Sequence, residues 1–206
     1  MNINFKSTEF IDSFLQINFT KGFKYIDKAG EIANLFVDNG DIENIGVSGL
    51  VIKNPLDGIS YLRVSSDTIW IQITKLTSYD KMIADLTKIV NKIQPIIQFD
   101  SCYRIGWRTR LILPNKQISE IVTVNSSFLN LEVNSISLTD NSDSLKINYN
   151  LNVIEKKVNK KLISSILLDF DISTTSKIDN DFTKYFTEML SLFSNTEKMS
   201  KIIKLN

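Results

Sequence analysis

The stretch Cys102-Tyr103-Arg104-Ile105-Gly106-Trp107-Arg108-Thr109-Arg110-Leu111-Ile112-Leu113 holds three of the four arginines of a chain that otherwise uses lysine for positive charge. Side chains of a strand alternate between its two faces, so an extended segment places Arg104, Arg108 and Arg110 on one face, with a gap at Gly106. The other face carries the residues that we expect to bury against a core: Tyr103, Ile105, Trp107, Thr109 and Leu111. Arginine in place of lysine indicates a site that needs a planar group able to hold a carboxylate or phosphate with two hydrogen bonds.

On the N-terminal side of this strand, the sequence predicts an amphipathic helix whose apolar stripe runs from Tyr79 to Ile93. Thr77 and Asp80 resemble a capping box at its start, and we expect Pro95 to end it. Earlier segments show the apolar periodicities of a strand over 10–19, a helix over 23–37 closed by Gly40, and strands over 44–53, 59–65 and 68–75.

On the C-terminal side, further strands are predicted over 117–124, 128–138, 144–154 and 162–172. The strict alternation from Leu145 to Val153 is typical of an antiparallel sheet with one solvated face. A last helix over 180–194, behind the N-cap candidate Asp179, carries an aromatic stripe. We interpret this stripe as core, or as a homodimer surface if the sheet does not cover it.

These elements predict an α+β fold, in which mostly antiparallel curved sheets pack on two or three amphipathic helices. Each half of the chain places an amphipathic helix after a meander, which suggests a pseudo-duplicated strand-helix-meander-helix unit. The length suits a single compact domain over 1–206, with 1–97 and 98–206 as its candidate halves.

Composition excludes several chemistries. The absence of histidine removes the Ser-His and Cys-His nucleophile pairs and every imidazole metal site, and we expect no cofactor. The single cysteine, Cys102, cannot form an internal disulfide, and we expect a buried thiol and a cytoplasmic protein. No segment has an apolar stretch as long as that of a signal peptide or a membrane span. The net charge of +1 provides no global electrostatic field that would attract the protein to a nucleic acid or an anionic membrane.

The arginine row has three interpretations. Asp169 and Asp171 share one parity, so an internal Arg/Asp ladder across two strands is one of them. The row could instead bind an anionic protein partner, or single-stranded nucleic acid with Tyr103 and Trp107 as stacking platforms. The nucleic-acid interpretation is disfavoured, because the rings of Tyr103 and Trp107 are expected on the face opposite the arginines.

An enzymatic alternative rests on Asp143, Glu155 and Lys157. Their spacing loosely matches the Asp…Glu-x-Lys pattern of Mg²⁺-dependent nucleases, in which carboxylates hold the metal and a lysine helps to activate water. The competing interpretation is the solvated end of a strand.

The stretch from Ile69 to Leu113 resembles a sporadically distributed, largely uncharacterised bacterial protein family, in which a strand and an amphipathic helix precede an Arg-Ile-Gly-hydrophobic-Arg-aromatic strand. Here that strand reads Arg104 to Thr109, with threonine at the aromatic position. The family's C-terminal Asp-x-Asp strand, followed by a helix, resembles Leu168 to Ile172 and the segment after it. The resemblance implies a component of a bacterial defence or toxin-neutralising system and assigns no catalytic residue.

Together these observations predict a non-catalytic protein that binds a protein partner through Arg104, Arg108, Arg110, Asp169 and Asp171. The alternatives are the nuclease and the single-stranded nucleic-acid binder.

Overall fold

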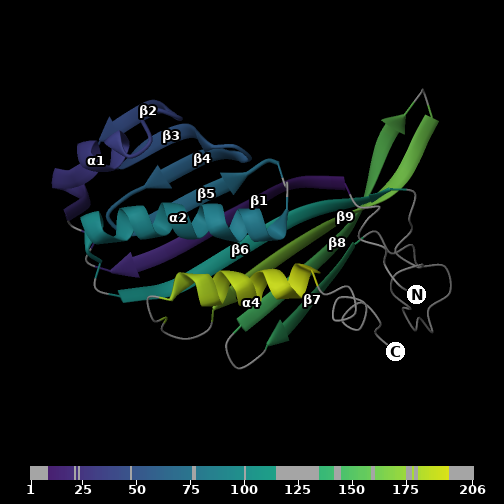
Figure 1. The fold of residues 1–206 in the computed structure, drawn as a ribbon. Helices are drawn as coiled ribbons and strands as arrows, with labels where there is room; N and C mark the ends of the chain where they lie inside the picture. The colour runs from purple at the N-terminus through teal and green to yellow at the C-terminus, as the bar shows by residue number, and fades with distance from the viewer. Residues whose placement is uncertain are drawn as a thin grey trace.

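The computed structural model describes residues 9–20, 22, 24–46, 48–75, 78–99, 101–114, 135–141, 145–158, 161–174, 178 and 181–194. These residues form an α+β fold in which three helices lie against one antiparallel sheet (Figure 1). The predicted fold class and the antiparallel pairing are therefore correct, and the described strands form one sheet rather than several.

The sheet is built from strands with these bounds: β1 (Glu9–Thr20), β2 (Asp41–Gly46), β3 (Gly49–Leu56), β4 (Ile59–Val64), β5 (Thr68–Ile73), β6 (Ser101–Pro114), β7 (Ser135–Asn141), β8 (Leu145–Val158) and β9 (Lys161–Thr174). Their order across the sheet is β2-β3-β4-β5-β1-β6-β9-β8-β7. The arginine strand β6 therefore lies near the middle, between β1 and β9.

The order of the strands is similar on the two sides of the β1/β6 pair. On one side β1 is followed by the meander β5, β4, β3 and β2, and on the other β6 is followed by β9, β8 and β7. Each meander thus ends beside the first strand of its own half. This order is compatible with the predicted pseudo-duplication, which stays a prediction, as does the division into halves or a single domain.

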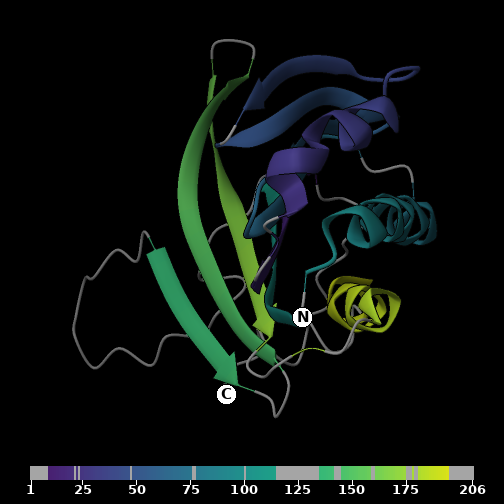
Figure 2. The same ribbon diagram turned by 90° about the vertical axis from the view of Figure 1, so that its left-hand side faces the viewer.

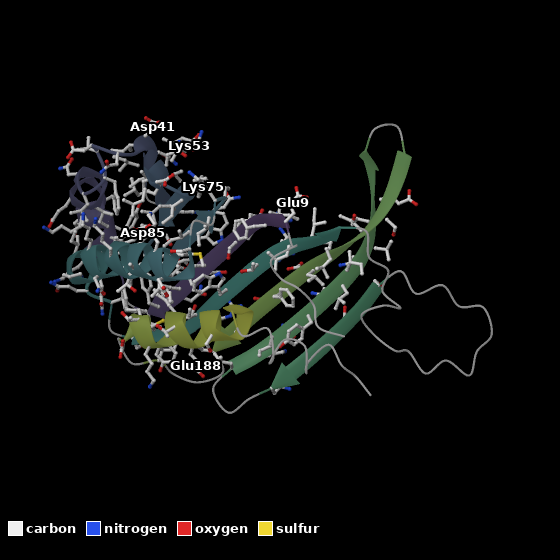
Figure 3. All side chains as sticks on the ribbon, turned by 45° about the vertical axis from the view of Figure 1, so that its right-hand side comes forward. Glu9, Asp41, Lys53, Lys75, Asp85 and Glu188 are labelled. Carbon is white, nitrogen blue, oxygen red and sulfur yellow. The ribbon has the colours of Figure 1, made fainter. Side chains whose placement is uncertain are left out.

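The helices are α1 (Lys24–Asn34), α2 (Tyr79–Ile97) and α4 (Phe182–Ser194). Figure 2 shows α2 and α4 side by side on one face of the sheet, and α2 contacts both other helices. The apolar side chains of the helices and of the covered sheet face form one buried cluster. Figure 3 shows the charged residues Lys53 on β3 and Glu188 on α4. Burial of these apolar stripes is the main force that holds the layers together.

One predicted strand is wrong in its bounds. The run predicted as a single strand over 44–53 is two strands, β2 and β3, which pair with each other through a reversal that ends at Gly49. Gly49 has a φ of 146°, a conformation that side chains with a Cβ rarely adopt. The continuous apolar run on both sides of the turn concealed this reversal.

The predicted end of the second helix is also wrong. Helix α2 continues through Pro95 to Ile97 and ends at Gln98, which is left-handed and donates its backbone N–H to the carbonyl of Gln94. Ile97 is fully buried, so packing of this last turn offsets the hydrogen bond that proline cannot make. At the other end the N-cap is Ser78, whose hydroxyl accepts the N–H of Lys81.

Some predictions fall outside the described residues. These are the strand over 117–124, the first part of the strand over 128–138, and the capping candidates Thr77 and Asp179.

At the start of α4, the carboxylate of Asp181 accepts the backbone N–H of Lys184, which is the contact of an N-cap.

Candidate binding face

Strand β6 separates its side chains as the alternation predicts over most of its length. Ile105, Trp107, Thr109 and Leu111 are buried on the helix-covered face. The Trp107 ring meets Phe186 of α4 edge-on, with 6.0 Å between the ring centroids. Its indole N–H donates to the hydroxyl of Ser13 on β1, so the polar atom of this buried ring has a partner. Because Trp107 faces the helices, it cannot serve as a stacking platform on the face that carries the arginines.

Tyr103 departs from the predicted pattern. The register of β1 and β6 shifts between the pairs Asn18–Arg104 and Phe19–Cys102, which leaves Tyr103 as an extra residue. Such a bulge moves one residue out of the alternation. Cys102 consequently takes the buried position, and Tyr103 is 50% exposed. The prediction that Tyr103 is buried is therefore wrong.

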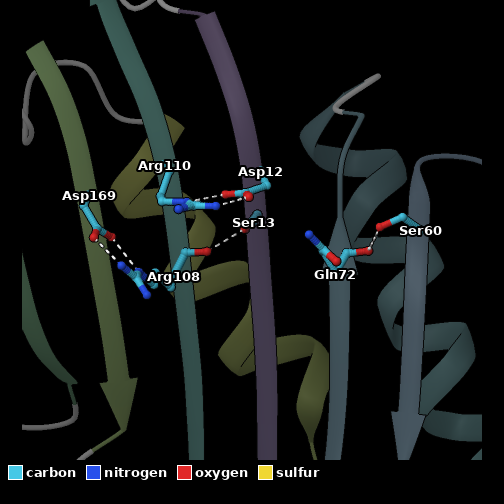
Figure 4. A network of polar contacts seen from close by, with 7 residues as sticks. All are labelled: Asp12, Ser13, Ser60, Gln72, Arg108, Arg110 and Asp169. Atoms are coloured by element: carbon cyan, nitrogen blue, oxygen red, sulfur yellow. Dashed lines mark hydrogen bonds and ion pairs between the residues drawn. The ribbon is translucent and has the colours of Figure 1, made fainter. Parts of the chain in front are cut away.

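Two of the three arginines form ion pairs on the sheet face away from the helices (Figure 4). Arg108 donates from Nε and Nη2 to the two carboxylate oxygens of Asp169, over 2.8 and 2.6 Å. Arg110 likewise donates from Nε and Nη2 to the two carboxylate oxygens of Asp12 on β1, so both ion pairs are bidentate. The predicted ladder is thus present for Arg108 and Asp169, whereas the partner of Arg110 comes from a strand that the sequence had not singled out.

The two carboxylates are much less accessible than their arginines. The side chains of Asp12 and Asp169 are 8% and 12% exposed, and those of Arg110 and Arg108 are 34% and 50% exposed. The hydrogen bonds that each arginine donates to its carboxylate raise the pKa of that arginine above the usual value, so both guanidinium groups stay charged. These bidentate, partly buried ion pairs fix the orientation of both guanidinium groups.

Arg104 and Asp171 are arranged differently. The side chain of neither residue forms an ion pair or a hydrogen bond with another described residue. The guanidinium of Arg104 lies over Gly106, because a Cβ built on that glycine would stand 2.8 to 3.0 Å from three guanidinium atoms. The gap that Gly106 leaves in the arginine row is therefore filled by Arg104. Asp171 is opposite Arg108 in the register of β6 and β9, while Arg108 pairs with Asp169 instead.

Three aromatic side chains form a row on this same face. The rings of Phe14 and Trp70 are stacked with centroids 5.3 Å apart, and Tyr61 meets Trp70 edge-on at 5.2 Å. The guanidinium of Arg110 lies over the Phe14 ring, 5.5 Å from its centroid. The sequence interpretation missed this row. The parity of Trp70, opposite to the buried isoleucines of its strand, was the available signal, but it does not reveal that β5, β1 and β6 are neighbours.

We call this surface the open face, because none of the described helices covers it. It comprises half-buried or exposed residues together with two buried carboxylates, from six neighbouring strands: Tyr61, Arg63, Trp70, Gln72, Asp12, Phe14, Gln16, Arg104, Arg108, Arg110, Asp169, Asp171, Asn148 and Asn150. Three hollows mark it, with volumes of about 560, 410 and 280 Å³. The central hollow of about 410 Å³ lies between Trp70, Arg104 and Asp171.

The residues of the nuclease alternative are not brought together among the described residues. Asp143 and the side chain of Lys157 lie outside them, and Glu155 is exposed on β8. Within the described ranges, no group of three or more Cys, Asp or Glu side chains is placed to hold a metal ion.

Among the described helices, none is both long and apolar enough to cross a membrane. Comparison of the chain with models of known protein families and with curated proteins found no match.

Proposed function

We propose that this chain is a non-catalytic binding protein that recognises a protein partner through the open face. The observation that carries the proposal is the presence of Trp70, Tyr61 and arginines side by side on a sheet face that no described helix covers. Tryptophan, tyrosine and arginine are the side chains that most often dominate the binding energy of protein interfaces.

The side chains of the open face are also held in place before any partner binds. Contacts between the rings fix the side chains of Phe14, Trp70 and Tyr61. Bidentate ion pairs fix those of Arg108 and Arg110. Association therefore requires little further loss of side-chain freedom, which favours affinity.

The same geometry favours a protein over single-stranded nucleic acid. Bases bind by stacking on the faces of aromatic rings. Here the Phe14 ring is covered by Trp70 and Arg110, and Trp70 is in contact with Phe14 and Tyr61. Two guanidinium groups are already neutralised by Asp12 and Asp169, so fewer cations remain for phosphates.

The setting that we propose follows from the resemblance of residues 69–113 and of the C-terminal strand to the bacterial family described above. In this proposal the protein acts in the cytoplasm as a component of a defence or toxin-neutralising system. The partner is then another protein of that system.

Site-specific photo-cross-linking tests the proposal. A photo-reactive amino acid at Gln72, on the open face, is compared with the same amino acid at Lys88, an exposed position of α2. In cells that naturally make the protein, the probe at Gln72 should give a discrete cross-linked protein, and the probe at Lys88 should not. With that protein purified, Trp70→Ala should weaken binding at least tenfold. Cross-links from Lys88 alone would overturn the proposal.

A second measurement separates binding from catalysis. The pure protein is incubated with Mg²⁺ and single-stranded or double-stranded nucleic acid, which should remain intact. Cleavage that disappears in Glu155→Ala would establish the nuclease alternative instead.

A further inference from the structure

The three hollows of the open face adjoin one another across the strands, and we call them together the trough. The first and the central hollow share Gln16 and Trp70, and the central and the third share Arg108 and Asp171. The trough therefore runs across the strands, from β4 at one end to β7 at the other. A shape of this kind fits an elongated ligand better than a compact one.

The length of the trough sets the size of its occupant. From β4 to β7 there are six inter-strand spacings, each of about 4.8 Å, which gives roughly 29 Å. An extended polypeptide advances about 3.3 Å per residue, so about nine residues span this distance.

The charges in the central hollow set the chemistry of the occupant. Arg104 and Asp171 both line it, and neither has an ion-pair partner among the described residues. In contrast, Arg108 and Asp169 neutralise each other at the side of the same trough. Phe14 and Trp70 provide an apolar wall, and the guanidinium of Arg104 lies over Gly106 beside it. An acidic and a basic group on the ligand would complement these two side chains, which lack an ion-pair partner in the described part of the chain.

We propose that the trough binds an extended segment of about nine residues from the partner protein, laid across the strands. An acidic side chain of this segment pairs with Arg104, and a basic side chain pairs with Asp171. The inference rests on the proposed function and adds to it the form and charge pattern of the partner segment.

The test uses a displayed library of random nine-residue segments, flanked by glycine-serine spacers and selected on the purified full-length chain. Enriched segments are synthesised, and their affinities are measured by fluorescence anisotropy. We expect segments that carry one acid and one base, and at least tenfold weaker binding to Arg104→Ala and to Asp171→Ala. Lys88→Ala, which removes an exposed charge on α2, should bind as the parent does.

Two further variants make the assignment specific. Arg104→Glu should recover binding when the acid of the segment is changed to lysine. Gly106→Ala should weaken binding while keeping the fold, because its new methyl group displaces only the flexible end of Arg104. Circular dichroism of each variant checks that it is folded.

The outcomes separate this inference from the proposed function. A library without binders, or binders that lack the charge pair, or binders equally strong on Arg104→Ala, would overturn the trough assignment. If cross-links from Gln72 are obtained in that case, the open face remains the binding surface. If cross-links arise only from Lys88, the proposed function fails as well.

Discussion

At Asp12, one buried carboxylate joins two central strands. Its side chain is 8% exposed and makes two hydrogen bonds to Arg110 on the neighbouring strand. Loss of this carboxylate leaves a partly buried guanidinium without its partner, which is costlier than loss of a solvated pair.

We therefore expect Asp12→Ala to lower the free energy of unfolding by about 1–2 kcal/mol. A double-mutant cycle with Arg110→Ala, measured by urea unfolding, should show that the two changes are not additive. Asp171→Ala is the matched control, because Asp171 has no ion pair among the described residues and its loss should change stability by less than about 0.5 kcal/mol. Equal effects of Asp12→Ala and Asp171→Ala would contradict this role.

The thiol of Cys102 makes stability depend on pH. Burial raises its pKa from an ordinary value of 9.0 to about 11. Between these values the folded protein keeps a proton that the unfolded chain has lost, so this contribution is full below pH 9 and is lost as the pH rises toward 11.

The free energy of unfolding should consequently fall between pH 8 and pH 10, and it should fall less in Cys102→Ala. Urea unfolding of both proteins at the two values measures the difference. The Cys102→Ala variant also serves as the control for other groups that titrate in this range, such as Tyr25, whose pKa burial raises. Identical falls in the two proteins would contradict a buried, protonated thiol.

Among individual residues, the sequence predicted the shared face of the arginines and the burial of Cys102, and it gave a ladder with Asp169 and Asp171 as one interpretation of the arginine row. The parity of side chains along one strand was sufficient for these features. It could not identify Asp12 as the partner of Arg110, because that requires knowing which strand lies beside β6. The burial of Tyr103 was predicted wrongly, since a bulge interrupts the alternation without a distinctive residue to mark it.

At the scale of the elements, helix α2 contains a proline in its last turn. Pro95 cannot donate the hydrogen bond that the carbonyl of Asn91 would otherwise accept, and its ring crowds that carbonyl. The helix nevertheless continues, because Ile93 and Ile97 are both fully buried.

Pro95→Ala should therefore raise the free energy of unfolding by about 1 kcal/mol. The gain in helix propensity is partly offset by the greater conformational entropy that alanine gives to the unfolded chain. Thermal unfolding followed by circular dichroism measures the change. A lower melting temperature would show that the proline is itself required for the end of α2.

Most elements were predictable from periodicity, because each of the helices and half-buried strands shows a clear apolar face. The division of one predicted strand into β2 and β3 was not, because Ile45 and Leu50 continue the apolar run on both sides of the turn. The aromatic row was also not predicted from the local sequence pattern, because Tyr61, Trp70 and Phe14 come together only through the pairing of β4, β5 and β1.

For the whole molecule, the pairing of β1 with β6 links the two halves of the chain through a long register. One sheet with one continuous buried cluster is expected to unfold as one cooperative unit. The two tryptophans allow this to be tested, because Trp70 lies in the first half and Trp107 in the second.

In Trp107→Phe the fluorescence reports on the first half, and in Trp70→Phe on the second. In each variant, the midpoint of urea unfolding by fluorescence should coincide with the midpoint by far-ultraviolet circular dichroism. Separate midpoints would show that residues 1–97 and 98–206 unfold independently.

If a protein partner covers the open face, the side chains of that face lose accessibility when the complex forms. Hydroxyl-radical footprinting of the complex with the cross-linked partner measures the accessibility of individual side chains. We predict that Tyr61 and Trp70 become protected, while Tyr185 on α4, a half-buried ring of the helical layer, keeps its reactivity. Protection of Tyr185 with unchanged Tyr61 and Trp70 would contradict binding at the open face, because it would place the partner on the helices.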